Sequence, residues 1–382
     1  MTNTTKTILG LIIAILVVWG IYSILQKSSE PMANEPIKIG FIGPLTGDMA
    51  TYGETEKNTI EIALEEINQS GELKRKLEVI YEDGKCSGKD AVTAAQKLIN
   101  IDKVHIILGG LCSTETLGVA PLVESNKVIL FSSLSSNPSI SQAGDYIFRN
   151  SPSDSEFGRA DAEFIVSQGI KRVAIITENT DYSQGVREIM KNIFQEKNID
   201  IVADEIFNSG TKDFRTYLTK IKSVNPEAIY INPGGSAAVA GLIPKQIGEL
   251  GIKNVKIFGN FLLGDKEALS VGGQAMEGII FSDSKDLTQL SGSLIEKYKS
   301  KFEKDPAHDA LVAARYDSVY IIKDAIKSCG NDDSDCIKNY LYDMPEYSGM
   351  IGSYKFDLNG DLLSEEFVIH KKIVDGVPQV IE

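Results

Sequence analysis

Hydrophobic residues along this chain fall into short apolar runs that alternate with longer amphipathic stretches. The first run, Ile37–Gly43, is followed by Ile60, Ala63, Leu64 and Ile67, whose spacing places them on one face of a helix. This couplet recurs, and the apolar runs predict strands at 37–43, 77–83, 104–109, 128–132, 171–177, 199–206, 227–232, 255–259 and 278–282. Buried strands that alternate with helices predict an α/β fold with doubly wound parallel sheets.

These strand-and-helix units are too many for one open sheet of ordinary size, so we expect two lobes. The polar stretch Arg149–Asp154 is the first expected crossing between them. The pattern alone leaves open whether the chain later returns to the first lobe. Nor does it assign the later predicted elements to a lobe; these are helices near 287–303 and 308–328 and strands at 350–356 and 366–370.

One proline stands inside a predicted helix. Pro244 follows a run of helix-forming and apolar residues, and proline in a helix interior removes one backbone hydrogen bond. We therefore expect Pro244 to break or kink that helix.

The N-terminus carries a segment of membrane-spanning length. Residues 7–26 are uncharged and largely apolar, between Lys6 and Lys27, and a transmembrane helix needs about 20 apolar residues. The sequence after this run offers no small-x-small cleavage site and no nearby cysteine for a lipid anchor. We therefore expect an uncleaved signal anchor in residues 1–27, with a cleaved signal peptide as the alternative, and a proline-containing linker in residues 28–36.

The chain has four cysteines, which are Cys86, Cys112, Cys329 and Cys336. Cys329 and Cys336 bracket a short polar loop, whereas Cys86 and Cys112 each follow a predicted strand and could meet at one end of a sheet. Four separate buried thiols are the alternative. An even number of cysteines in a translocated protein permits disulfides, so the expected anchor and the cysteines together predict an extracytoplasmic domain, in the periplasm or at the cell surface.

Composition and charge narrow the function classes. The chain has 382 residues, of which 42% are hydrophobic and 24% charged, as is typical of a soluble globular protein. Its net charge of −14 argues against binding to a nucleic-acid backbone, which needs clustered Lys and Arg.

The motifs of common enzyme classes are absent. The three histidines, His105, His308 and His370, lie far apart and lack metal-ligand spacing. No Gly-x-Gly-x-x-Gly follows a strand, and the sequence has no phosphate-binding Gly-Lys-Ser/Thr loop and no Gly-x-Ser-x-Gly elbow. We therefore expect a protein that is not an enzyme and needs no metal or cofactor.

Two turns rich in hydroxyl groups follow neighbouring predicted strands. They are Leu111–Thr116 and Ser132–Asn137. In open α/β sheets, ligands lie beyond the carboxyl ends of the strands, and the N–H groups of helix N-termini there suit a carboxylate. The alternative is that these side chains only cap helices and shape turns.

The ordered motifs of the chain resemble one known family. The resemblance covers residues 36–382 and rests on these segments in order: Ile37–Gly47, Tyr52-Gly53, Ala63-x-x-Glu66-Ile67-Asn68, Tyr81-Glu82-Asp83-x-x-Cys86, Leu108–Ser113 and Tyr182–Gly185. Together they are similar to the branched-chain amino-acid (Leu/Ile/Val) binding proteins, which are type I periplasmic binding proteins that serve ABC importers.

This resemblance implies an architecture and partners. It implies two Rossmann-like lobes joined by three crossovers, preceded here by the transmembrane helix, with a Cys86–Cys112 bridge beside the ligand. The expected first lobe is then 37–150 plus 283–350, and the second is 151–282 plus 351–382. The implied partners are an amino acid or related small carboxylate, held by lobe closure, and an ABC permease in the membrane. A receptor coupled to signalling instead of transport is the alternative.

The resemblance also implies ligand-binding residues by position. Ser113 and Ser136 would bind the ligand carboxylate, while the carbonyl of Leu134 and the hydroxyl of Ser136 would take part in holding its ammonium. Tyr52 would pack on the ligand side chain and Tyr182 would close from the second lobe. The set expected to contact the ligand comprises Tyr52, Leu111, Ser113, Leu134, Ser136, Tyr182 and Phe261.

One departure from the family pattern concerns the ammonium group. Where the family carries a glutamate, this chain has Phe261, and a tyrosine of the family is replaced near Gly234-Gly235-Ser236. A buried ammonium without a carboxylate costs several kcal/mol. Either another acid, such as Asp181 or Asp265, serves, or the ligand lacks an ammonium and is an amide, urea, or an aromatic or aliphatic carboxylate.

Overall fold

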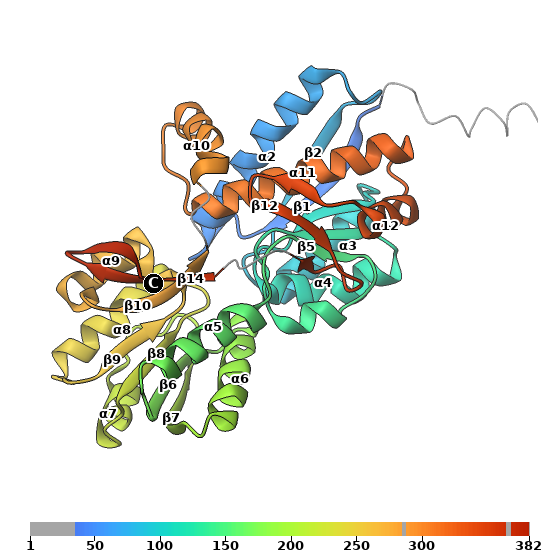
Figure 1. Ribbon diagram of the computed structural model, residues 1–382. Coiled ribbons are helices and arrows are strands. Elements are labelled where there is room, and N and C mark those ends of the chain that lie inside the picture. The colour runs from blue at the N-terminus through green and yellow to red at the C-terminus, as the bar shows by residue number, and fades with distance from the viewer. Residues whose placement is uncertain (1–34, 285–287, 364–367, 382) are drawn as a thin grey trace, which may run out of the picture.

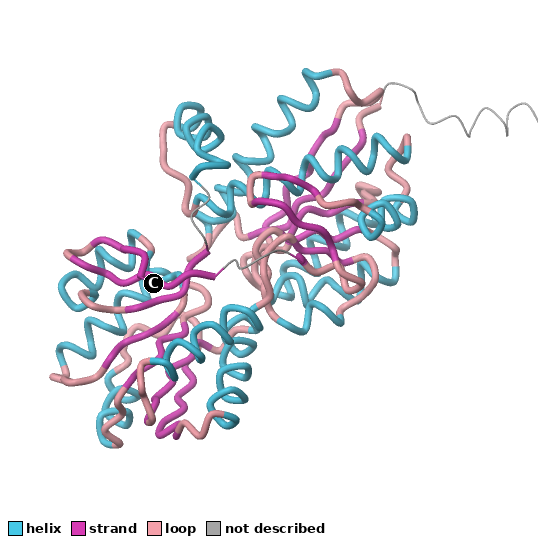
Figure 2. The backbone as a smooth tube through the Cα atoms, viewed as in Figure 1, coloured by secondary structure: helices cyan, strands magenta, loops and turns pink. Residues whose placement is uncertain are grey.

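The computed structural model describes residues 35–284, 288–363 and 368–381, and these form two α/β lobes (Figure 1). In each lobe the strands lie inside and the helices lie on both faces of the sheet (Figure 2). The α/β fold with parallel, doubly wound sheets that the sequence predicts is confirmed.

The first lobe contains a five-stranded parallel sheet in the order β2-β1-β3-β4-β5. Its strands are β1 (Ile37–Gly43), β2 (Leu77–Asp83), β3 (Ile106–Gly109), β4 (Ile129–Ser132) and β5 (Ile147–Arg149). Its helices are α2 (Ala50–Ser70), α3 (Gly88–Asn100), α4 (Ser113–Ser125), α10 (Thr288–Phe302), α11 (Asp309–Cys329) and α12 (Ser334–Asp343), with a short 3-10 turn η1 (Pro138–Gln142).

Alternation of side chains along the strands divides the first lobe into two core layers. On β1, Ile39 and Phe41 pack against α2, α11 and α12, whereas Ile42 faces α3 and α4. All three side chains are fully buried. Helices from two distant parts of the chain, α2 and α11, therefore cover the same face.

The second lobe contains a seven-stranded sheet in the order β15-β14-β10-β9-β8-β6-β7, in which β14 and β15 pair antiparallel. Its strands are β6 (Arg172–Glu178), β7 (Asp200–Phe207), β8 (Ala228–Asn232), β9 (Lys256–Gly259), β10 (Ile280–Ser284), β14 (Val368–Val374) and β15 (Val377–Ile381). Its helices are α5 (Asp154–Ser167), α6 (Asp181–Glu196), α7 (Arg215–Ser223), α8 (Ala237–Glu249) and α9 (Lys266–Gly272), with 3-10 turns η2 (Phe261–Gly264) and η3 (Gly273–Met276).

Pro244 does not end its helix. Helix α8 runs without a break from Ala237 to Glu249, so of the two expected effects of Pro244, a break or a kink, the break does not occur. Ala240, Ile243 and Ile247 bury one face of α8 in the core of the second lobe, and this packing on both sides of the proline offsets the one lost backbone hydrogen bond.

A small antiparallel sheet corrects the predicted lobe boundary. It comprises β11 (Tyr347–Gly349), β12 (Gly352–Phe356) and β13 (Leu362–Leu363). The sequence assigns 351–382 to the second lobe, yet Phe356 packs edge-on against Phe131 and Phe148 of the first lobe. Residues 351–363 therefore belong to the first lobe. The strand expected at 350–356 is present as β12, and the chain turns at 350–351 so that β12 forms a hairpin with β11.

The chain passes between the lobes after β5, between β10 and α10, and between β13 and β14. Residues 1–34, 285–287 and 364–367 lie outside the described residues, so the expected anchor (1–27) and most of the expected linker lie outside them too. In the part that is described, no helix has the length and apolar character needed to cross a bilayer.

Both expected cysteine pairs are disulfides. Cys86 is bonded to Cys112, and Cys329 at the end of α11 is bonded to Cys336 in α12. None of the four cysteines remains free.

Candidate ligand-binding site

A cavity of about 430 Å³ lies between the two lobes. Its walls include the loops that follow β1, β2, β3 and β4 in the first lobe and β6, β8 and β9 in the second. The carboxyl ends of both sheets therefore face one space, which is where α/β sheets bind ligands. The size is within the range of small-molecule pockets.

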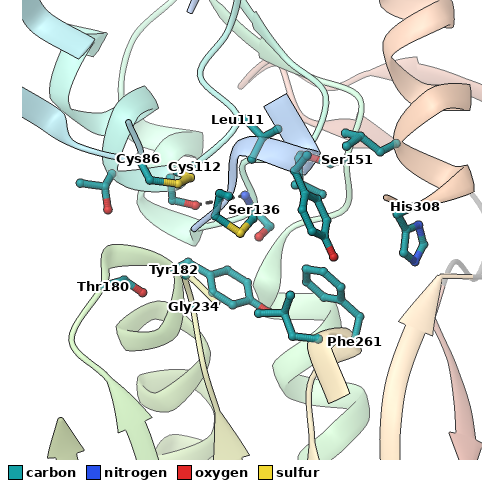
Figure 3. Close-up of a pocket in the computed structure, with 18 of the residues that line it drawn as sticks. Cys86, Leu111, Cys112, Ser136, Ser151, Thr180, Tyr182, Gly234, Phe261 and His308 are labelled. Atoms are coloured by element: carbon teal, nitrogen blue, oxygen red, sulfur yellow. Dashed lines mark hydrogen bonds between the residues drawn. A yellow bond between two sulfur atoms is a disulfide. The ribbon is translucent and has the colours of Figure 1, made fainter. Parts of the chain in front are cut away.

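The seven residues of the set expected to contact the ligand all line this cavity. The first lobe contributes Tyr52, Leu111, Ser113, Leu134 and Ser136, and the second contributes Tyr182 and Phe261. Figure 3 shows Leu111 and Ser136 on one side and Tyr182 and Phe261 on the other.

Ser113 joins the two hydroxyl-rich turns. Its hydroxyl oxygen accepts the backbone N–H groups of Ser136 at 3.3 Å and Asn137 at 3.2 Å. Because Ser113 begins α4, its own N–H and that of Thr114 lie in the first turn, which has no intrahelical acceptors. The hydroxyl of Ser136 has no hydrogen-bond partner among the described residues. These donors, with the positive end of the α4 dipole, suit an anionic group.

A buried glutamate organises the start of α4. Glu115 accepts the N–H groups of Cys86, Leu111 and Cys112, each at 3.0 Å. Its carboxyl is fully buried, and burial raises its pKa to about 7 although these N–H donors oppose the rise. The backbone N–H groups of Cys86, Leu111 and Cys112 are thus already hydrogen-bonded. The N–H groups left for a ligand at the start of α4 are those of Ser113 and Thr114.

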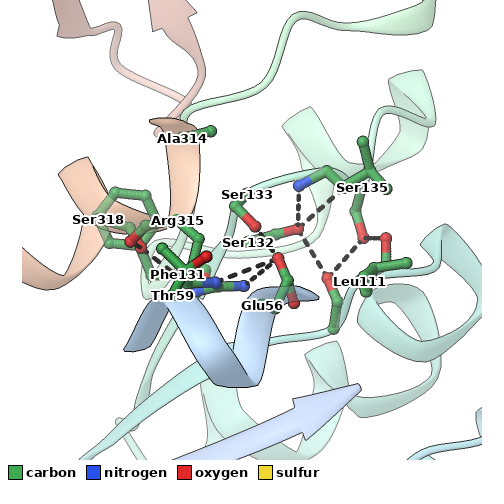
Figure 4. Close-up of polar contacts among 12 residues, drawn as sticks. Glu56, Thr59, Leu111, Phe131, Ser132, Ser133, Ser135, Ala314, Arg315 and Ser318 are labelled. Carbon is green, nitrogen blue, oxygen red and sulfur yellow. Dashed lines mark hydrogen bonds and ion pairs between the residues drawn. The ribbon is translucent and has the colours of Figure 1, made fainter. Parts of the chain in front are cut away.

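The remaining serines of the second turn hold its shape. The hydroxyls of Ser132 and Ser135 donate to the carbonyl oxygen of Gly110, at 2.7 and 2.9 Å. Ser133 donates to Glu56, which is paired in turn with Arg315 (Figure 4). For these serines the alternative interpretation, that hydroxyls shape turns, is correct.

The Cys86–Cys112 disulfide forms part of the cavity wall (Figure 3). Cys86 follows β2 and Cys112 precedes α4, so the bond ties the loop beyond one strand to the helix start that carries Ser113. This position beside the cavity agrees with the position implied by the family resemblance.

The second lobe presents an aromatic surface to the cavity. The ring centroids of Tyr182 and Phe261 lie 6.4 Å apart, and the Phe261 ring lies 6.1 Å from that of His308, which stands at the start of α11 in the first lobe. Thr180 caps α6 by accepting the N–H of Ser183 at 3.2 Å, which fixes the direction in which Tyr182 leaves the helix. This wall suits an apolar ligand side chain.

Neither acid suggested by the sequence lines the described cavity. Asp265 accepts the hydroxyl of Tyr52 at 3.0 Å and caps α9 through the N–H of Glu267 at 2.8 Å. Asp181 offers its backbone carbonyl to the side-chain amide of Asn137. Both make contacts between the lobes instead of facing the space that a ligand would occupy.

Sequence reasoning missed three acids that do line the cavity, which are Asp48, Glu178 and Asp283. Asp283 is paired with His308 at 3.2 Å and Lys371 at 2.7 Å. Burial pushes the pKa of Asp283 up, but these two cations outweigh it and lower the pKa to about 2. Glu178 could have been suggested from the sequence, because it ends an apolar strand and most of the residues expected to contact the ligand lie just beyond strand ends.

Comparison with known proteins decides the family. The family model for periplasmic binding proteins matches residues 36–369. The chain belongs to the periplasmic binding protein family. Members of this family are substrate-binding proteins, so this chain is a binding protein and not an enzyme.

Three similar proteins illustrate the relationship. The leucine-, isoleucine-, valine-, threonine- and alanine-binding protein of Pseudomonas aeruginosa is 28% identical over 90% of this chain and 92% of its own length. A leucine-binding protein from Thermotoga maritima superposes with a TM-score of 0.81 at 29% identity, covering 91% of this chain and 98% of that one. A branched-chain amino-acid binding protein from Streptococcus pneumoniae, solved with isoleucine, has a TM-score of 0.79 at 26% identity, covering 91% and 99%.

Proposed function

We propose that this binding protein holds a branched-chain amino acid, or a closely related small carboxylate, between its lobes and delivers it to an ABC permease. The single observation that carries the proposal is the meeting of Ser113 and Ser136 at the wall of the interlobe cavity. Their donors and the α4 N-terminus supply hydrogen bonds for a carboxylate without a fixed charge, so the ligand can also leave.

The aromatic wall of the second lobe supports an apolar ligand side chain. Tyr182 and Phe261 line the cavity opposite the serines, and Leu111 lines it from the first lobe. A ligand bound first through its carboxylate on the first lobe would be covered by these rings on closure. Hinge closure around a ligand is a known response of two-lobed binding proteins, and the permease would recognise the closed form.

We further propose that the protein works outside the cytoplasm and is held at the membrane by residues 1–27. The uncharged run at 7–26 and the two disulfides support this placement. Cell fractionation of the full chain tests it: the anchor predicts recovery in the membrane fraction, whereas recovery of a chain lacking residues 1–27 in the soluble extracytoplasmic fraction would indicate a cleaved signal.

Isothermal titration calorimetry with leucine, isoleucine, valine, alanine and an aromatic carboxylate such as 4-hydroxybenzoate tests the proposed ligand. Ser113→Ala and Ser136→Ala should each weaken binding by about 1–3 kcal/mol, because a ligand oxygen loses a donor. Ser125→Ala, an exposed serine at the far end of α4, is the matched control and should leave affinity unchanged. Unchanged affinity in both cavity variants would place the ligand elsewhere.

A further inference from the structure

Three residues with a carboxylate side chain line the cavity in the described part of the chain: Asp48, Glu178 and Asp283. Asp48 is exposed to solvent, where water already satisfies its charge. Asp283 is committed to two cations of the protein, His308 and Lys371. Glu178 is therefore the lining acid whose charge calls for a further partner.

The environment of Glu178 is incomplete for a buried carboxylate. Only 2% of the surface of Glu178 is exposed to solvent. One carboxylate oxygen, Oε2, accepts the N–H groups of Gly234 at 2.8 Å and Gly235 at 3.0 Å. Among the described residues it forms no ion pair. Burying an ionised carboxylate without a counter-charge is costly, and N–H donors on one oxygen compensate this cost only in part.

The strand register explains why Glu178 faces this space. Side chains alternate along β6, so Ala174, Ile176 and Glu178 share one face of the sheet. Ala174 and Ile176 pack in the core under α8, and Glu178 continues that face at the carboxyl end, beside the Gly234-Gly235 turn after β8.

We propose that the Glu178 carboxylate receives the ammonium group of the ligand and so selects α-amino acids over carboxylates that lack an amino group. This inference rests on the proposed function, because it takes the carboxylate to be bound at Ser113 and Ser136. Glu178 then supplies the acid that is missing at Phe261; it lies on β6 of the same lobe, which β8 separates from the β9 strand that precedes Phe261.

With Glu178 as the ammonium site, the carboxylate and the ammonium of an amino acid bind to different lobes. The carboxylate site belongs to the first lobe and Glu178 to the second, with the cavity between them. A zwitterionic ligand therefore links the lobes through both of its charges, whereas a simple carboxylate is held firmly by the first lobe alone. Selectivity and lobe closure follow from the same contact.

The competing role for Glu178 is purely structural: bracing the Gly234-Gly235 turn through two N–H bonds. Glu178→Gln separates the roles. The glutamine side chain has the same length and keeps one oxygen to accept both N–H groups, but it carries no charge for an ammonium. Glu196→Gln, which removes an exposed acid at the end of α6 in the second lobe that does not line the cavity, is the matched control.

The test is calorimetric titration of the folded protein with leucine and with 4-methylpentanoate, which is leucine without its amino group. The wild type should bind leucine at least about 30-fold more tightly than 4-methylpentanoate. Glu178→Gln should lose most of that preference by weakening leucine binding, with 4-methylpentanoate affinity changed less than about threefold. Glu196→Gln should retain the preference.

Several outcomes would overturn the inference. If Glu178→Gln weakens both ligands equally, Glu178 only braces the turn. If the wild type binds both ligands equally tightly, no acid in the cavity selects an ammonium, yet the proposed carboxylate site survives; this comparison needs no variant to fold. If the wild type binds neither ligand nor any other in the solute panel, the proposed function fails together with this inference.

Discussion

The hydroxyl of Tyr52 in the first lobe donates a hydrogen bond to Asp265 of the second lobe at 3.0 Å, across the gap in which the cavity lies. Tyr52 is buried, and this burial, reinforced by the Asp265 charge, holds the pKa of its phenol well above the usual value. The neutral phenol is thus a permanent donor to Asp265. The bond helps to set the relative position of the lobes.

Removing this hydrogen bond should loosen the contact between the lobes. Tyr52→Phe keeps the ring but leaves Asp265 without the phenol donor, and hydrogen bonds to charged groups contribute about 1.5–3 kcal/mol. We expect a lower melting temperature and a larger radius of gyration in small-angle X-ray scattering of the ligand-free protein. An unchanged radius would mean that the remaining contacts alone fix the lobes.

The two disulfides should differ in their effect on binding. Replacing Cys86 and Cys112 together with serine frees the start of α4 and should lower both stability, by about 2–4 kcal/mol, and ligand affinity. Cys329 and Cys336 are only 7 residues apart in the sequence, so replacing both opens a short loop, and this loop does not line the cavity. This second variant should lose less stability and keep its affinity. Thermal unfolding and titration calorimetry measure both effects, and equal affinity in the two variants would contradict the expectation.

The Asp283–His308 pair, which joins β10 to the start of α11, should make stability depend on pH. The pKa of Asp283 is lowered to about 2, so its contribution is complete above the ordinary value of 3.8 and is lost as the pH falls toward 2. Burial opposes the charged form of His308, but Asp283 outweighs it and raises the pKa; that contribution is complete below the ordinary 6.5 and is lost as the pH rises through the raised value.

Both contributions are therefore present together from about pH 4 to pH 6.5. Asp283→Asn should lower the melting temperature most within this window, and the difference from the wild type should shrink toward pH 2 and at alkaline pH. Melting curves of the two proteins across this range check the expectation. A difference that does not vary with pH would show that Asp283 acts through packing alone.

The Glu56–Arg315 pair behind the Ser133 turn should be essential to stability. Both side chains are completely buried, and Arg315 also donates to the carbonyl of Phe131 at 3.3 Å. Arg315→Met leaves Glu56 as an unpaired buried charge. This should lower the free energy of unfolding, measured by urea denaturation, by about 3–5 kcal/mol. Adding Glu56→Gln should recover part of that loss, since the uncompensated charge is removed. A double variant with the summed loss of both single variants would contradict this coupling.

Much of this fold could be predicted from the sequence, because local patterns carry the information. Apolar runs and helical spacing identify most strands and helices, and the order of the motifs is sufficient to suggest the lobes, the cysteine pairing near the cavity and the set of residues around Ser113 and Ser136. The errors concern the later part of the chain. Tyr354 and Phe356 look like any strand residues in sequence, and only their packing beside Phe131 and Phe148 assigns residues 351–363 to the first lobe.

The sequence by itself determined which residues lie at the strand ends, since the spacing of apolar and polar positions is a local property. Tertiary structure alone decided which acid faces the cavity. Glu178 ends a strand, and Asp181 and Asp265 lie soon after strand ends. Asp265 is held by Tyr52 and Asp181 begins α6, whereas the register of β6 turns Glu178 toward the space between the lobes. The direction of a side chain at a strand end depends on the sheet face and on contacts from the other lobe, and neither is encoded by neighbours in the sequence.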